Sequence, residues 1–153
     1  QFGELGKRGT GYEIEFLIRK LIQILNIEQV WDTIIIGAGD IGRGLARYHG
    51  FLERGFQVAG VFDIDQKKIG DEVGKLKVKS MDEMVDFVKQ NKIQIAMLAV
   101  PAEHAQEAVD LLVEAGITAI LNYAPIYLQV PKQVQVEHID PSVHLQKLSY
   151  FLN

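Results

Sequence analysis

The chain has no cysteine and no excess of basic residues, and each absence excludes a class of protein. Its 153 residues include 16 lysines and arginines against 20 aspartates and glutamates, a formal net charge of −4. The lack of cysteine excludes a disulfide scaffold, a thiolate metal site and a cysteine nucleophile, and it fits the reducing cytoplasm. Because acidic residues outnumber basic ones, we do not expect these residues to bind nucleic acid by themselves.

Long hydrophobic runs and metal-ligand spacings are also missing. The longest stretch without a charged side chain extends from Ala115 to Pro131 and includes Gly116, Asn122 and Pro125, so it is a poor membrane span. No H-x-x-x-H or H-E-x-x-H pattern occurs among the four histidines, which are His49, His104, His138 and His144. We therefore expect neither a membrane partner nor a metal.

The chain does contain apolar runs that alternate with helical patterns. Six runs predict strands, at residues 33–36, 57–62, 76–79, 93–100, 117–121 and 134–138. Helices are predicted at residues 12–25, 40–51, 81–90, 102–115 and 141–151, with a turn or short helix at 65–69. Strands separated by helices are typical of a parallel sheet with right-handed crossovers. We predict an α/β fold with a Rossmann-like doubly wound sheet of order 3-2-1-4-5-6, a flanking N-terminal helix and a C-terminal helix.

A glycine-rich motif follows the first predicted strand. Residues 37–42 are Gly-Ala-Gly-Asp-Ile-Gly, which is G-x-G-x-x-G. The first glycine permits a tight turn, the second lets a pyrophosphate approach the backbone, and the third lets helix and strand pack closely. The N-terminus of the next helix offers free N–H groups to phosphates. The context favours dinucleotide binding over a plain strand-to-helix turn.

An acidic residue stands at the distance expected for ribose binding. Asp63 ends the second predicted strand, 21 residues after Gly42. A carboxylate there can accept hydrogen bonds from both hydroxyls of the adenosine ribose and repels a 2′-phosphate, which favours NAD over NADP. Asp65 is a second candidate acceptor, although a role in the turn is the interpretation that we favour for it.

The turns after the fourth and fifth predicted strands should face the glycine-rich motif, because ligands of doubly wound sheets lie across the carboxyl ends of the strands. Asn122 has two equally weighted roles, either binding the carboxamide or ribose of the ligand or bridging backbone groups of its loop. The predicted cofactor-binding residues are Gly37, Ala38, Gly39, Asp40, Ile41, Gly42, Asp63, Ile64, Val100, Pro101, Asn122, Tyr123, Ala124 and Pro125.

Groups that could transfer protons at a bound dinucleotide are scarce. The turn at residues 99–104 resembles that of sugar dehydrogenases of the Rossmann class, which usually present a lysine after the next strand. This chain has Asn-Tyr-Ala-Pro at 122–125 and no lysine there. For Tyr48 and Tyr123, the sequence shows no lysine or serine partner that could lower the pKa of the phenol. We therefore predict binding without catalysis and name no catalytic residue.

Several short segments, spread over nearly the whole chain, together resemble one family. They include Phe-Gly-Glu-Leu-Gly-Lys-Arg-Gly-Thr-Gly-Tyr at 2–12 and Leu-Ser-Tyr-Phe at 148–151. The others lie at 37–42, 48–51, 62–65, 99–101, 115–117 and 122–125. The combination resembles the bacterial Rex family of redox-sensing transcriptional repressors.

This resemblance implies a homodimer with a winged-helix domain that binds operator DNA and a Rossmann domain that senses the NADH/NAD⁺ ratio. It implies that NADH closes the dimer and releases the operator, and that the final helix is exchanged between subunits. Tyr48 would lie near the nicotinamide and belong to the switch. Asp140 would be the switch carboxylate that pairs with a basic residue of the winged-helix domain. Pro141 departs from some family members, which carry a larger apolar side chain there.

The first residue is Gln1 and not Met, and we interpret the chain as part of a longer protein. On the resemblance, residues 1–11 are the end of the winged-helix domain and its linker, residues 12–140 are the NAD(H)-binding domain, and residues 141–153 are the dimerisation helix. We expect Lys7 and Arg8 to contact operator phosphates only in the full-length protein.

Two alternative functions fit the same motifs. One is a fragment of an NAD-dependent oxidoreductase whose substrate domain lies outside the chain. The other is a CoA-binding domain, because some CoA ligase domains share this Rossmann subtype. Asp63 argues against the second, since its carboxylate disfavours the phosphorylated ribose of CoA.

Overall fold

The structure is a computed structural model, which describes residues 10–25 and 29–153. These residues divide into two units, one of residues 10–25, 29–31 and 48–57, the other of residues 32–47 and 58–153. The described strands are β1 (Trp31–Ile36), β2 (Phe56–Asp63), β3 (Glu72–Val73), β4 (Leu76–Ser80), β5 (Ile95–Leu98), β6 (Ala119–Asn122) and β7 (Gln135–His138). The described helices are α1 (Thr10–Leu25), α2 (Asp40–Arg47), α3 (Gly50–Glu53), the 3₁₀ turn η1 (Met81–Glu83), α4 (Met84–Asn91), α5 (Ala102–Ala115) and α6 (Pro141–Tyr150).

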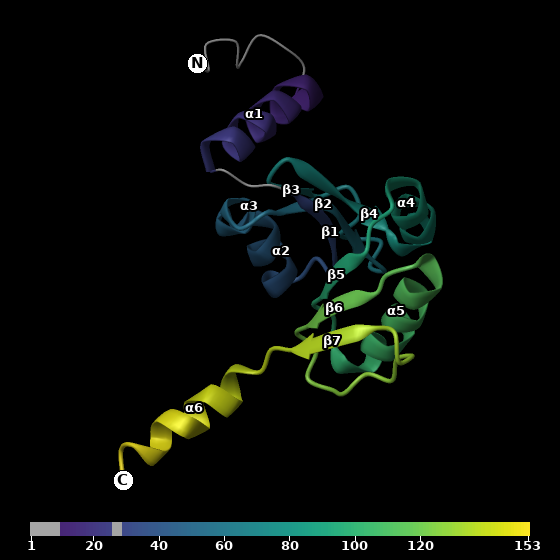
Figure 1. The fold of residues 1–153 in the computed structure, drawn as a ribbon. Coiled ribbons are helices and arrows are strands. Elements are labelled where there is room, and N and C mark those ends of the chain that lie inside the picture. The colour runs from purple at the N-terminus through teal and green to yellow at the C-terminus, as the bar shows by residue number, and fades with distance from the viewer. Residues whose placement is uncertain (1–9, 26–28) are drawn as a thin grey trace. The chain divides into compact units, whose positions relative to one another are not determined.

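The strands form one sheet in the order β3-β4-β2-β1-β5-β6-β7 (Figure 1). The pairs β1–β5, β2–β4, β5–β6 and β6–β7 are parallel. Numbered by the six predicted strands, the order is 3-2-1-4-5-6. The predicted doubly wound, Rossmann-like topology is therefore confirmed.

The sequence pattern does not predict β3. This strand pairs antiparallel with β4 at the edge of the sheet, with Val73 opposite Leu76. Gly74 in the connecting turn has a φ of +60°, a left-handed conformation that favours glycine. A strand of two residues is too short for hydrophobic periodicity to detect.

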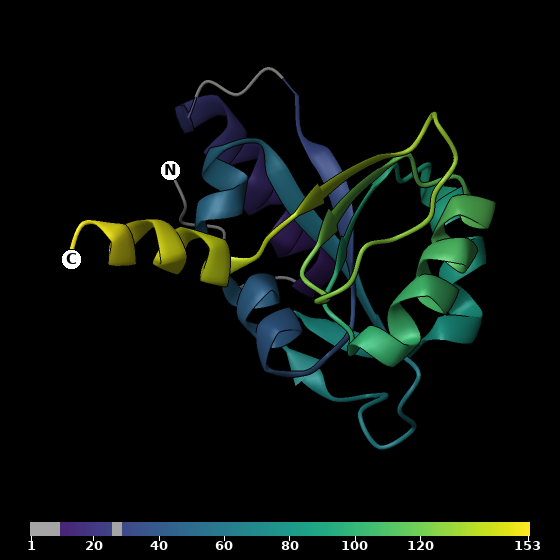
Figure 2. The same ribbon diagram turned by 90° about the horizontal axis from the view of Figure 1, so that it is seen from below.

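Apolar side chains of β1 are buried on both faces of the sheet. Ile34 belongs to a cluster with Met84 of α4 and Leu112 of α5, and all three are fully buried. Ile35 lies on the other face, where its Cγ2 is 3.4 Å from the position that a Cβ on Gly42 of α2 would take. Figure 2 shows α4 and α5 on one face of the sheet and α2 on the other. This burial explains why the strand is a continuous apolar run.

The helix predicted at residues 40–51 is wrong as a single element, because α2 ends at Arg47 and α3 begins at Gly50. A Cβ on Gly50 would lie 2.4 Å from the ring of Tyr48, so the missing side chain lets this ring fold against the backbone. The helix predicted at 81–90 is likewise divided. Ser80 accepts a hydrogen bond from the N–H of Asp82 at 3.2 Å and starts the 3₁₀ turn that precedes α4.

The predicted C-terminal helix is confirmed as α6, with its predicted cap. The Asp140 carboxylate accepts hydrogen bonds from the N–H of Ser142 at 3.0 Å and from its hydroxyl at 2.6 Å. No residue of α6 is buried, and Leu145 and Leu148 are 64% and 59% exposed. In the part of the chain that the structure describes, each helix is too short or too polar to span a membrane.

The register of the sheet brings the carboxyl ends of three strands together. Leu98 of β5 lies opposite both Ile36 of β1 and Asn122 of β6. The turns that follow these strands therefore open at the same edge of the sheet. Gly37, the first residue of the glycine-rich motif, lies at this edge directly after β1. The chain adds β2 and β4 on one side of β1 and then β5, β6 and β7 on the other, so β1 and β5 meet at the topological switch point of the sheet.

Candidate dinucleotide-binding site

A cavity of about 600 Å³ lies at the carboxyl ends of β1, β2, β5 and β6, within the second unit. That volume is in the range of small-molecule sites. Ten of the predicted residues line it, namely Gly37, Gly39, Asp40, Ile41, Asp63, Ile64, Val100, Pro101, Tyr123 and Pro125. The cavity is thus at the switch point of the sheet, where the sequence predicted a ligand site.

The three glycines of the motif have distinct surroundings. Gly37 has a φ of +108°, and a Cβ on it would lie 2.2 Å from the carbonyl oxygen of Ala99. A Cβ on Gly42 would lie 1.7 Å from the carbonyl oxygen of Gly37. The tight turn and the close helix packing predicted for these glycines are confirmed. A Cβ on Gly39 would meet nothing within 4 Å, so the space beside this residue is open.

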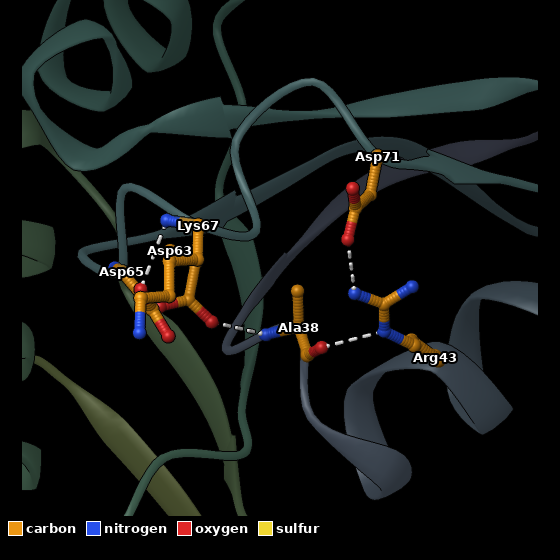
Figure 3. A network of polar contacts seen from close by, with 6 residues as sticks. All are labelled: Ala38, Arg43, Asp63, Asp65, Lys67 and Asp71. Atoms are coloured by element: carbon orange, nitrogen blue, oxygen red, sulfur yellow. Dashed lines mark hydrogen bonds and ion pairs between the residues drawn. The ribbon is translucent and has the colours of Figure 1, made fainter.

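Asp63 connects the glycine-rich loop to the turn after β2 (Figure 3). Its Oδ2 accepts a hydrogen bond from the N–H of Ala38 at 2.7 Å, and its Oδ1 accepts one from the N–H of Asp65 at 2.8 Å. A carboxylate has about four acceptor positions, so Asp63 keeps free capacity at the cavity. Asp65 makes the turn contact that we favoured for it, since its Oδ1 accepts the N–H of Lys67 at 3.0 Å.

Arg43 takes part in the same network, and the sequence analysis missed it (Figure 3). Its Nε donates to the carbonyl oxygen of Ala38 at 2.7 Å, and its Nη2 donates to Oδ2 of Asp71 at 2.8 Å. The side chain of Arg43 is 25% exposed, against 45% for Asp71. No motif signals this contact, because Arg43 and Asp71 are 28 residues apart in the chain.

On the opposite side of the cavity, Asn122 fixes the loop after β6. It is fully buried, its Oδ1 accepts the N–H of Ala124 at 2.9 Å, and its Nδ2 donates to the carbonyl oxygen of Ile126 at 3.0 Å. Nδ2 also lies 3.0 Å from Nδ1 of His138. Asn122 therefore makes the loop-bridging contacts that were one of its two predicted roles. Burial raises the pKa of Tyr123, which lines the cavity as a protonated phenol at neutral pH.

Four predicted residues lie behind the cavity and not on it. Ala38 and Gly42 shape the glycine-rich loop, whereas Asn122 and Ala124 belong to the buried base of the other loop. The cavity lining also includes residues that the sequence analysis did not assign to the ligand, among them Lys68, Met81 and His104. Lys68 lies five residues after Asp63, and His104 lies in the first turn of α5, three residues after Pro101. Their closeness in sequence to predicted site residues is the signal that could have identified them.

The other predicted residues have separate places. Tyr48 belongs to the first unit, is 60% exposed and packs edge-on against Phe51 with ring centroids 4.9 Å apart. Hydrogen bonds from the hydroxyl and the N–H of Ser142 lower the pKa of the exposed Asp140 carboxyl, which is therefore charged at neutral pH. Lys7 and Arg8 lie outside the described residues. The switch roles of Tyr48 and Asp140 stay predictions.

The chain is similar to known repressors over nearly its whole length. The redox-sensing transcriptional repressor Rex of Chloroflexus aggregans is 42% identical over 151 residues, which are 99% of this chain and 71% of that protein. A family model described as a CoA binding domain matches residues 28–126.

Two solved structures of a related protein have the same fold. The crystal structure of RSP in complex with β-NADH has a TM-score of 0.79 and 40% identity, over 92% of this chain and 68% of that one. RSP in complex with β-NAD⁺ and operator DNA has a TM-score of 0.77 and 40% identity, over 97% of this chain and 69% of that one. The fold, the glycine-rich cavity and this identity together show that the chain belongs to the Rex family of redox-sensing transcriptional repressors and, over residues 28–126, to the CoA binding domain family.

Proposed function

We propose that this chain is the NADH/NAD⁺-sensing core of a transcriptional repressor, with NAD(H) as its cofactor. One observation carries the proposal. The cavity lined by the glycine-rich loop and Asp63 lies in a chain that is 40% identical to a repressor described in complexes with NADH and with NAD⁺ and operator DNA.

The residues of the cavity fit a dinucleotide. The open space beside Gly39 leaves room for a pyrophosphate to approach the backbone and the N-terminus of α2. The free acceptor positions of Asp63 suit the two hydroxyls of an unphosphorylated ribose. The turns that carry Val100, Tyr123 and Pro125 would then face the nicotinamide end.

The nicotinamide ring supplies the signal, because it is neutral when reduced and carries a positive charge when oxidised. Apolar side chains such as Val100, Pro101 and Pro125 favour the neutral ring, since a charge is costly to desolvate. To shift a two-state dimer, NADH must bind one arrangement more tightly than the other, because equal affinities shift nothing. We propose that Tyr48 and Asp140 belong to the element that changes between the two arrangements.

We propose a homodimer in which α6 packs against the partner subunit, because Leu145, Leu148 and Phe151 are at least 59% exposed in a single chain. Residues 12–140 would form the NAD(H)-binding domain and residues 141–153 the dimerisation helix. NADH binding would rearrange this dimer and release operator DNA from the winged-helix domains of the full-length protein, to which residues 1–11 would connect. Both the operator and the NAD(H) pool imply a cytoplasmic location.

Calorimetric titration with NADH, NAD⁺ and NADPH tests the proposal. We expect NADH to bind more tightly than NAD⁺, and NADPH to bind weakly because Asp63 repels its 2′-phosphate. Equal affinities for NADH and NAD⁺ would contradict a ratio sensor. In the full-length repressor, rising NADH/NAD⁺ ratios should release a labelled operator duplex in a mobility-shift experiment.

We infer binding without turnover, because the turn at residues 122–125 has no lysine, where sugar dehydrogenases of the Rossmann class usually present one. Incubation of the chain with NADH and a panel of carbonyl compounds checks this inference. A loss of NADH absorbance above the rate without protein would establish an oxidoreductase instead.

Coenzyme A is the second candidate ligand, since the matching family model is described as a CoA binding domain. We expect CoA to compete poorly with NADH, because the Asp63 carboxylate disfavours a phosphorylated ribose. Displacement of bound NADH by an equal concentration of CoA would reverse this assignment.

A further inference from the structure

Two charged side chains hold the peptide groups of Ala38 from opposite ends. The N–H of Ala38 donates to Asp63 at 2.7 Å, and its carbonyl oxygen accepts from Nε of Arg43, also at 2.7 Å (Figure 3). Ala38 is fully buried and both bonds are partly buried, which limits competition from water. Asp63 therefore fixes the peptide group between Gly37 and Ala38, and Arg43 fixes the next one, between Ala38 and Gly39.

This orientation has a consequence for Gly39. The peptide bond is trans, so the carbonyl of Ala38 and the N–H of Gly39 point in opposite directions. Because Arg43 holds the carbonyl, the N–H of Gly39 is directed away from the guanidinium, on the residue that lines the cavity. This N–H has no hydrogen-bond partner among the residues that the structure describes. It is available to an anionic ligand.

The far end of the guanidinium is fixed as well. Nη2 of Arg43 pairs with Asp71 at 2.8 Å, and the backbone of Asp71 accepts from Val78 of β4 at 2.9 Å and donates to Lys68 at 3.1 Å. Arg43 does not itself line the cavity, whereas Lys68 does. A planar guanidinium can bond Ala38 and Asp71 at once in a fixed geometry, which a lysine ammonium cannot reproduce.

We propose that Arg43 is a positioning residue that aims the N–H of Gly39 at the diphosphate of the bound dinucleotide. The proposal rests on the proposed function, since it takes NAD(H) to be the ligand. Arg43 acts through the carbonyl of Ala38 and not by touching the ligand, and Asp71 holds the guanidinium in place for this task.

Arg43→Gln and Arg43→Lys test the proposal, with Arg47→Gln on the same helix as the matched control, because Arg47 is exposed. We expect both Arg43 variants to lower the affinity for NADH about tenfold in calorimetric titrations, the loss for one hydrogen bond to a charged group. Arg47→Gln should leave the affinity unchanged. In ¹H–¹⁵N spectra, NADH should move the Gly39 amide proton strongly downfield in the unmodified chain and only weakly in Arg43→Gln.

The outcomes are separable. Unchanged NADH affinity in both Arg43 variants overturns the proposal. It is also overturned if the affinity falls but NADH moves the Gly39 amide proton as far downfield in Arg43→Gln as in the unmodified chain. If the unmodified chain binds no NADH, the proposed function fails. Titration with inorganic pyrophosphate then tests the role of Arg43 separately, because pyrophosphate should move the Gly39 amide proton further downfield in the unmodified chain than in Arg43→Gln. Thermal unfolding monitors the fold of each variant, and Asp71→Ala, which releases only the far end of Arg43, should lower the affinity less than Arg43→Gln.

Discussion

The two walls of the cavity are held in place by different chemistry. One, which we call the glycine wall, is formed by Gly37, Gly39 and Asp63, and charged side chains fix the loop that carries its glycines. Asp63 and Arg43 both bond to Ala38, at 2.7 Å each. The glycine wall therefore presents backbone N–H groups to the cavity while charges fix the loop that carries them.

The other, which we call the proline wall, is formed by Pro101, Tyr123 and Pro125. It is held by neutral amides, those of the buried Asn122 and the exposed Gln106. None of the three side chains of this wall is charged at neutral pH, because burial raises the pKa of the Tyr123 phenol above its already high usual value.

The difference suits the two ends of a dinucleotide. A diphosphate is anionic in every redox state, so rigid donors serve it whatever charges lie behind them. A nicotinamide ring changes its charge with redox state. A fixed charge beside the ring would add a constant term to the difference in binding free energy between NADH and NAD⁺. On the proposed function, with the ring at the proline wall, support by neutral amides would leave desolvation of the ring as the energy that discriminates NADH from NAD⁺.

The largest effect is expected from Gly42→Ala, which places a methyl group against the backbone of Gly37 in the glycine wall. A Cβ there would lie 1.7 Å from the carbonyl oxygen of Gly37, a backbone atom that cannot move aside cheaply. We expect a loss of about 3 kcal/mol in the free energy of unfolding, measured by urea denaturation. Gly44→Ala is the control on the same helix, where nothing lies within 4 Å of the new atom. It should stabilise the chain by about 0.5–1 kcal/mol, and equal midpoints for the two variants would contradict the account.

Asn122→Ala removes the main support of the proline wall. The change leaves the buried N–H of Ala124 without its acceptor at 2.9 Å and the carbonyl of Ile126 without its donor at 3.0 Å. We expect a loss of about 2 kcal/mol in the free energy of unfolding, together with weaker NADH binding. Asn91→Ala, which removes an exposed side-chain bond to Phe87, is the control and should cost about 0.5 kcal/mol. A stability loss without any change in NADH affinity would mean that this wall does not contact the ligand.

Asp63→Asn removes the charge of the glycine wall at nearly constant side-chain volume. The amide oxygen can accept only one of the two N–H groups that Asp63 holds, those of Ala38 and Asp65, so we expect a loss of about 1 kcal/mol in the free energy of unfolding, and the repulsion of a 2′-phosphate is lost. We expect the preference for NADH over NADPH to fall about tenfold in calorimetric titrations. Asp86→Asn on α4 supplies the control, and an unaltered preference in Asp63→Asn would remove Asp63 from the ribose site.

The sequence predicts the sheet and the glycine wall well, because both depend on local patterns. Continuous apolar runs identify the strands buried on both faces, and the spacing of Gly37, Gly39 and Gly42 specifies the turn and the helix contact. The break between α2 and α3 is less visible, since it depends on where the ring of Tyr48 lies against Gly50.

The supports of the two walls are harder to predict, because they join residues that are far apart in the chain. Arg43 bonds Asp71 across 28 positions, and Gln106 bonds Gln129 across 23. Asn122 could not be assigned from its sequence position, since an amide suits a ligand and a loop equally well. Only the 2.9 Å and 3.0 Å contacts to its own loop identify the bridging role.

The smallest effect is expected from Gln106→Ala, which loosens the proline wall from outside. The Gln106 amide donates to the carbonyl oxygen of Gln129 at 2.9 Å and accepts its N–H at 2.8 Å, so it ties the loop after β6 to α5. Both bonds are exposed to water, so we expect a loss of only about 0.5–1 kcal/mol in the free energy of unfolding. NADH affinity should fall about two- to threefold, because Tyr123 and Pro125 are held less firmly. Gln90→Ala, on the exposed face of α4, is the control for both measurements. If Gln106→Ala weakened NADH binding more than Asn122→Ala, the main support of the wall would be the outer clamp and not the buried amide.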